Sequence, residues 1–133
     1  MALLEGQQHG GLGAGIGQAL YEHVEYDEDG NLLAANLATY AMPSAAELPS
    51  YDTVSVETPT PLNPLGAKGI GEAATIGSTP AVANAVIDAL AMYGIEHLDL
   101  PHSPERVWRA LTDAAAGIVR DPGAHPWPTL PEK

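Results

Sequence analysis

The sequence contains no cysteine and no phenylalanine, and only five of its 133 residues are lysine or arginine. Without cysteine there is no disulfide, no thiolate nucleophile and no iron–sulfur or zinc site built on sulfur ligands. Seventeen acidic residues give a formal net charge of −12, which repels nucleic-acid phosphates and anionic lipid surfaces. We therefore expect neither nucleic-acid binding nor a role at membrane surfaces.

Long apolar segments are also missing. No stretch approaches the ~20 residues that cross a bilayer, and Met1–Gly6 lacks the basic and apolar regions of a signal peptide. We therefore expect no membrane span and a cytoplasmic location. The chain has 22 alanines, 14 glycines and 12 prolines, which leave few large side chains for a core. We predict that the isolated chain is marginally stable, oligomeric or prone to aggregation.

A glycine-rich helix is predicted near the start of the chain. Leu12, Ile16 and Leu20 recur every four residues, which predicts a helix over Gln7–His23. Glycines at positions 10, 11, 13, 15 and 17 oppose it, because each costs roughly 1 kcal/mol in a helix interior. Either Gly10, Gly13 and Gly17 share one face of the helix and form a strip that a ligand or another backbone can approach closely, or the first part is an irregular loop. The pattern leaves both interpretations open.

Two or three antiparallel strands are predicted next, at Val24–Tyr26, Leu32–Met42 and Thr53–Glu57. Asp29-Gly30 supplies the left-handed turn that a hairpin between the first two requires. The prolines at positions 59, 61 and 64 interrupt any regular element and lead into a glycine loop over residues 65–72.

Two helices are predicted after the glycine loop. Thr79 and Pro80 are suited to the cap and first position of one helix, which Gly94 ends. After a short strand over His97–Leu100, Ser103 caps the other helix. The order predicts an α+β fold: a glycine-rich helix, two to three antiparallel strands, a glycine loop and two C-terminal helices.

The glycine loop invites comparison with nucleotide-binding motifs. A Walker loop is excluded because Gly69, and not serine or threonine, follows Lys68. Gly69–Ala74 matches a dinucleotide-binding variant, but a proline-rich segment precedes it where a buried strand is required. The remaining interpretation is a carboxylate, Glu72, presented from a stiff glycine segment as a general base. Composition alone favours a surface glutamate in a loop.

Longer stretches carry a family resemblance. The most specific are Gly66–Gly77 and Pro80–Leu90. Further matching stretches are Glu5–Gln7, His9–Gly11, Gly15–Glu22, Tyr40–Pro43, Glu57–Pro59, Asn63-Pro64 and Pro104–Trp108. Together they resemble the C-terminal part of molybdenum hydroxylase large subunits, the family of xanthine dehydrogenases, aldehyde oxidoreductases and aerobic carbon monoxide dehydrogenases. The resemblance covers nearly the whole chain up to about Leu111.

The resemblance implies a domain assignment and a site. Residues 1–120 would be the C-terminal segment of a molybdopterin-binding domain, and residues 121–133 a proline-rich tail. Glu72 would be the catalytic base, and Lys68, Gly69, Ile70 and Gly71 would lie against the cofactor. No residue of this chain is implied as a metal ligand.

The resemblance also implies cofactors and partners. The cofactor would be molybdopterin with molybdenum, in its cytosine dinucleotide form, with copper added in the carbon monoxide branch. Electrons would leave through iron–sulfur clusters and FAD on partner subunits. The partners would be the remainder of the molybdenum-binding large subunit, these iron–sulfur and flavin subunits, and a small-molecule substrate. Overall similarity favours the carbon monoxide dehydrogenase branch.

Two departures from the family pattern accompany the resemblance. Ala14 occupies a position where the family often has a glutamine that contacts the cofactor. The family's large subunit is several times longer, and its other cofactor loops and its substrate-selecting loop precede the matched part. The alternatives are therefore a non-catalytic assembly remnant or scaffold fragment, and a free-standing nucleotide-binding module. The sequence does not identify the substrate.

Overall fold

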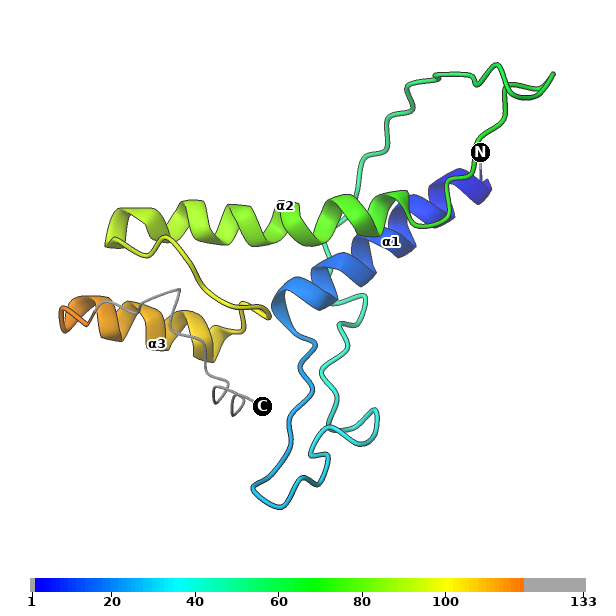
Figure 1. Ribbon diagram of the computed structural model, residues 1–133. Helices are drawn as coiled ribbons and strands as arrows, with labels where there is room; N and C mark the ends of the chain where they lie inside the picture. The colour runs from blue at the N-terminus through cyan, green and yellow to red at the C-terminus, as the bar shows by residue number, and fades with distance from the viewer. Residues whose placement is uncertain (1, 119–133) are drawn as a thin grey trace, which may run out of the picture.

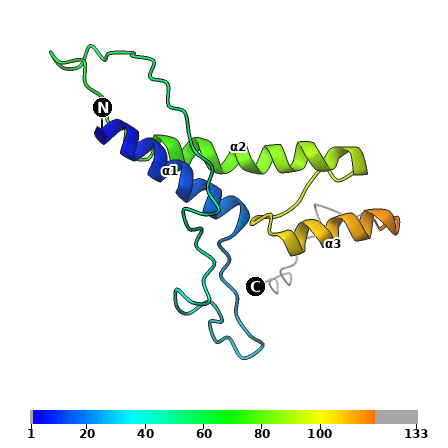
Figure 2. The same ribbon diagram turned by 180° about the vertical axis from the view of Figure 1, so that it is seen from behind.

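A computed structural model describes residues 2–118 (Figure 1). Its elements are α1 (Ala2–Leu20), α2 (Ala73–Leu90), the 3-10 helix η1 (Ala91–Tyr93) and α3 (Pro104–Ala115). Residues 21–72 form two long irregular excursions that leave the helices in opposite directions, as Figure 2 shows from behind. The proline-rich tail over residues 121–133 lies outside the described residues.

The predicted strands are absent from residues 2–118, where one antiparallel bridge, between Tyr26 and Leu32, is the whole of the β structure. The β part of the α+β prediction was therefore wrong: Val24–Tyr26, Leu32–Met42, Thr53–Glu57 and His97–Leu100 form no sheet. The alternating pattern of a strand specifies a face, but a strand also needs neighbours that pair with its backbone groups. Beyond the short pairing around the Tyr26–Leu32 bridge, the described chain offers none.

The turn predicted between the first two strands does form. Gly30 adopts a left-handed backbone with φ +82°. The Asp27 N–H donates to the Asn31 carbonyl at 2.9 Å, and the Asp27 Oδ1 accepts from the backbone N–H of Asn31 at 2.8 Å and of Asp29 at 3.0 Å. The Asn31 side chain donates to Asp27 Oδ2 at 2.9 Å. This turn is held by local hydrogen bonds and needs no sheet.

Acidification is expected to open this turn. The hydrogen bonds from Asn31, first from its side chain and then from its backbone, lower the pKa of Asp27 from its ordinary value of 3.8. A lowered pKa means that these bonds contribute fully above pH 3.8, and that the contribution is lost as pH falls through the folded-state value. We expect the Asn31 amide resonance to titrate below pH 3.8, and Asp27→Asn to abolish that titration. An amide shift that is flat down to full protonation would contradict this.

Helices α1 and α2 pack closely through small residues. A Cβ added at Gly11 would lie 2.6 Å from the Ala74 Cβ, and one at Gly15 would lie 2.9 Å from the Thr79 backbone N. The Ser78 Oγ donates across the contact to the Gly11 carbonyl at 3.1 Å. The helical interpretation of this glycine segment is therefore confirmed, and another backbone is what approaches its glycines.

The glycines in contact are not the ones expected. Gly10, Gly13 and Gly17 were predicted to form a strip for a ligand or backbone, but Gly11 and Gly15 face α2. Gly13 lies beside Leu48, and Gly17 lies beside Pro43 and the Glu22 carboxylate. A Cβ at Gly10 would meet nothing within 4 Å. The spacing predicted that the face of α1 with Gly10, Gly13 and Gly17 makes the contact, but α2 packs on the adjacent face, which contains Gly11 and Gly15.

The start of α2 was predicted wrongly. Thr79 and Pro80 are not its cap and first residue, because the helix begins at Ala73 and contains Pro80 in its interior. An interior proline leaves one carbonyl without its N–H partner and is unfavourable by ~3 kcal/mol. The additional turns over residues 73–79 are stabilised by the α1 contact, in which Ser78 is buried. The predicted end holds, since Gly94 adopts φ +76° after η1.

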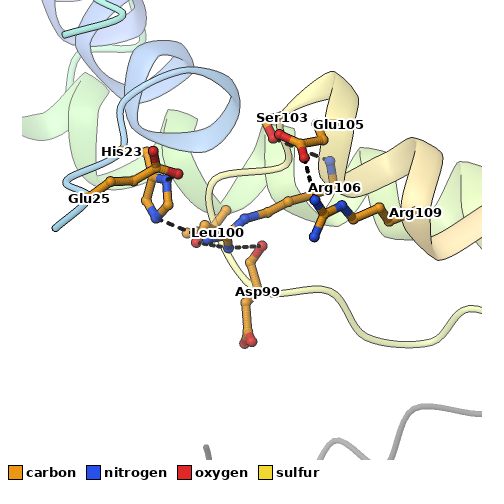
Figure 3. A network of polar contacts seen from close by, with 8 residues as sticks. All are labelled: His23, Glu25, Asp99, Leu100, Ser103, Glu105, Arg106 and Arg109. Carbon is orange, nitrogen blue, oxygen red and sulfur yellow. Dashed lines mark hydrogen bonds and ion pairs between the residues drawn. The ribbon is translucent and has the colours of Figure 1, made fainter. Parts of the chain in front are cut away.

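Helix α3 begins as predicted, with Ser103 accepting a hydrogen bond from the Arg106 N–H at 3.3 Å and Pro104 in the first turn. Arg106 also donates to the Leu100 carbonyl at 2.7 Å, and its Nη2 lies 3.0 Å from His23 Nε2 (Figure 3). Because a guanidinium only donates, His23 accepts at Nε2 and carries its proton on Nδ1, 2.8 Å from Glu25 Oε1. This network ties α3 to the segment after α1.

The described core is small. Its buried apolar residues are Ala19, Leu90 and Ala110, and no large side chain is fully buried. The chain exposes 10393 Å², whereas a globular monomer of this mass exposes about 6,600 Å². These values support the prediction that the isolated chain is marginally stable. No helix in residues 2–118 is long and apolar enough to cross a membrane.

Candidate functional site

The candidate site begins where a stiff turn ends. The Asn63 Oδ1 accepts from the backbone N–H groups of Leu65 and Ala67, each at 3.1 Å, and its Nδ2 donates to the Ala67 carbonyl at 2.9 Å. Gly66, with φ +64°, donates its N–H to the Asn63 carbonyl at 3.0 Å. Asparagine is suited to such turns because its side chain mimics a backbone group. Because the turn ends at Ala67, it fixes the position of the backbone directly before Lys68.

Lys68 points back toward the segment that precedes the turn. Its Nζ donates a hydrogen bond to the Thr58 Oγ1. Lys68 and Glu72 are four residues apart in the sequence, but no ion pair joins them in the part of the chain that the structure describes. The Lys68 ammonium therefore links the two ends of the loop over residues 58–68. In the described residues it does not neutralise the Glu72 carboxylate.

Gly69 and Gly71 have no role in packing within the described chain. A Cβ added at either position would meet nothing within 4 Å, and neither residue has a positive φ. Neither backbone conformation nor local crowding therefore requires glycine here. Glycine is also selected where another molecule approaches the main chain closely. The open glycines on both sides of Ile70 fit a cofactor lying against the backbone.

Glu72 is the N-terminal capping residue of α2 and is exposed. Its side chain makes no capping hydrogen bond, and among residues 2–118 no hydrogen bond or ion pair engages its carboxylate. Acidic side chains are favourable at helix N-termini. Ala74 and Thr75, in the turn that Glu72 starts, contact Gly11 of α1. The carboxylate is thus accessible, and it is carried by a packed helix end.

The other surfaces of the described chain do not complete this site. Two surface hollows lie near α3; their lining residues are Leu98, Asp99, Arg106 and Arg109 for one, and Tyr93, Leu111, Ala114 and Ala115 for the other. Neither includes a residue of Lys68–Glu72. Over residues 2–118, no group of three or more histidine or acidic side chains is arranged to hold a metal ion. Lys68–Glu72 is therefore an open segment that lines neither hollow.

Sequence reasoning missed two residues that hold the Lys68–Glu72 segment in place. Asn63 closes the turn before the motif, and the Asn-Pro pair at residues 63 and 64, together with Gly66, was the available turn signal. Thr58 accepts a hydrogen bond from the Lys68 ammonium. These residues are ten apart across a proline-rich turn, and no local sequence pattern connects them. The departure at Ala14 lies on an exposed position of α1.

Comparisons with known proteins identify the family of the chain. Residues 1–49 match the family described as "Molybdopterin cofactor-binding domain". The carbon monoxide dehydrogenase large chain of Hydrogenophaga pseudoflava is 43% identical over 111 residues, which are 84% of this chain and 14% of that one. The putative xanthine dehydrogenase molybdenum-binding subunit XdhA of Escherichia coli strain K12 is 38% identical over 107 residues, 80% of this chain and 14% of that one.

A solved structure gives the same result. The reconstituted CO dehydrogenase from Oligotropha carboxidovorans has a TM-score of 0.82 and 37% identity, over 87% of this chain and 14% of that chain. The family match covers α1 and the segment after it, and the structural match extends over most of the chain. The chain belongs to the molybdenum hydroxylase family and corresponds to the C-terminal part of the molybdenum-binding domain in its large subunits. It spans about a seventh of the length of these relatives.

Proposed function

We propose that residues 1–120 act as the C-terminal segment of the molybdopterin-binding domain in a molybdenum hydroxylase large subunit. In this role Lys68, Gly69, Ile70 and Gly71 lie against the cofactor, and Glu72 is the general base. The observation that carries the proposal is the pair of open glycines, Gly69 and Gly71, directly before an accessible carboxylate. When bound, the molybdenum cofactor supplies two-electron redox chemistry that no side chain can provide.

The residues of this chain divide the work between them. The Asn63 turn and the Lys68–Thr58 hydrogen bond fix the entry to the glycine segment. The Gly69 and Gly71 backbones leave the cofactor a surface free of side chains. Glu72 accepts a proton at its carboxylate oxygens, because it is held at a helix end and no other residue in 2–118 binds its carboxylate.

The proposal extends to the rest of the enzyme. The cofactor is the cytosine dinucleotide form, and copper accompanies molybdenum if the activity is that of the carbon monoxide branch. Iron–sulfur clusters and FAD on partner subunits would supply the route by which electrons leave. The remainder of the large subunit supplies the other walls and selects the small-molecule substrate. The marginal core and the open site support this dependence on a larger partner.

Substitution of the open glycines tests the cofactor contact. Gly71→Val in the assembled large subunit is expected to lower molybdenum and pterin content by about tenfold or more, because two methyl groups would occupy the approach to the backbone. Assembly is expected to persist, because a Cβ at this position meets nothing within the chain. Elemental mass spectrometry and pterin fluorescence measure the content.

Gly77→Val, which adds the same side chain, is the matched control for this experiment. Its added Cβ also meets nothing within 4 Å, but it lies on α2 beyond Glu72. We expect it to retain full cofactor content. An assembled Gly71→Val enzyme with normal molybdenum and pterin would remove the contact between cofactor and backbone from the account.

A further inference from the structure

The segment over residues 50–58 has the features of a strand that lacks a partner. It is extended, and within residues 2–118 no backbone group of these nine residues forms a hydrogen bond. Pro49 and Pro59, which have no N–H, stand at its two ends. Unpaired backbone groups in such a segment are a template for pairing with another strand.

The side chains of the segment divide into two faces. Val54 and Val56 project to the same side of an extended chain, and they are 81% and 83% exposed. Thr53, Ser55 and Glu57 lie on the opposite side and are polar. The division holds over residues 53–57 only, because Asp52 lies on the valine side and Tyr51, whose ring lies 5.5 Å from that of His9, lies on the other. A strand with one apolar and one polar face packs one side on a core and leaves the other in solvent.

We propose that residues 50–58 pair as a β-strand with an exposed sheet edge in the part of a molybdenum-binding large subunit that lies outside these residues. Two observations support the rest of the large subunit as the partner of this strand. The chain spans 14% of the carbon monoxide dehydrogenase large chain that it matches, so most of such a subunit is available as a partner. The chain exposes 10393 Å², and addition of a strand to a sheet covers both backbone groups and an apolar face.

This inference rests on the proposed function, because it takes its partner from it. It also explains the wrong strand prediction at Thr53–Glu57. The alternating pattern encodes a face for a sheet, but the sheet belongs to the partner. Residues 50–58 then lead directly into Thr58 and the Asn63 turn, so strand pairing would also position the arm that binds Lys68.

Hydrogen exchange on the assembled complex tests the pairing. Amides in residues 52–57 are expected to exchange at least about 100-fold more slowly than in an unstructured chain, with protection at alternate residues. A complex with its molybdenum in place, in which these amides exchange without protection, would overturn the strand and leave the proposed function standing. Failure of the chain to assemble with any larger molybdenum-binding chain would overturn both.

A pair of double variants adds a second measurement. Val54→Asp with Val56→Asp is expected to weaken assembly at least about 100-fold, because two buried apolar side chains are replaced by charges. Thr53→Asp with Ser55→Asp carries the same charges on the solvent face and is expected to assemble within about threefold of the parent. If both double variants weaken assembly equally, or if neither weakens it, the assignment of Val54 and Val56 to the buried face is wrong.

Discussion

Glu72→Gln is expected to lower the turnover of the assembled enzyme by about 10²–10⁴-fold, the contribution of a positioned general base. Glutamine has the same size but cannot accept the proton. Cofactor content and assembly should be unchanged, because no hydrogen bond or ion pair in the described chain depends on this carboxylate. The measurements are kcat and molybdenum content on the same preparation.

Asp88→Asn is the matched control for Glu72→Gln. Asp88 is also an exposed acid of α2, but it lies near the opposite end of the helix. We expect the Asp88→Asn enzyme to retain its turnover. An assembled, molybdenum-loaded Glu72→Gln enzyme with full turnover would remove the catalytic role and favour a chain that serves only in assembly.

The second large effect is expected at the contact between α1 and α2. Gly11→Ala with Gly15→Ala forces each new Cβ to within 3 Å of α2 backbone, at Thr75 N and Thr79 N. Overpacking costs about 1–3 kcal/mol per site, which outweighs the roughly 1 kcal/mol that each alanine gains in helix propensity. We expect a lower free energy of unfolding and lower cofactor content together, because this contact also carries the helix end that presents Glu72.

Gly10→Ala separates steric crowding from helix propensity. Gly10 precedes Gly11 on the same helix, and its added Cβ would meet nothing within 4 Å. It is expected to stabilise the assembled protein by roughly 1 kcal/mol. Denaturant unfolding of the assembled protein compares both variants with the parent. If the double variant unfolds at the same denaturant concentration as the parent, the close helix contact is wrong.

Local signals in the sequence predicted the local parts of the fold. The Ser103-Pro104 cap of α3, the Gly94 stop and the Asp29-Gly30 turn all form, because each depends on residues within one or two turns of itself. The start of α2 was missed because its first two turns depend on Gly11 and Gly15, which lie some sixty residues away. Contacts at that separation have no signature in local spacing.

The strands were predicted but do not form, for a different reason. Residues 50–58 carry a valid strand pattern, and what the chain lacks is a partner for its backbone. For the candidate site, the family resemblance predicted that Lys68–Glu72 faces the cofactor, and this stays a prediction. The structure adds that Gly69 and Gly71 are open and that Lys68 binds Thr58. A local sequence pattern does not show whether a glycine backbone is free of neighbours, nor which distant residue a side chain bonds to.

Molybdenum per chain, measured by elemental mass spectrometry on gently purified native protein, tests the central claim most directly. The proposed function predicts about one molybdenum atom per copy of this chain, together with the remainder of a large subunit. A native preparation with neither molybdenum nor the rest of a molybdenum-binding subunit would contradict it. The glycine segment would then record common ancestry with the molybdenum hydroxylases without a present role at a cofactor.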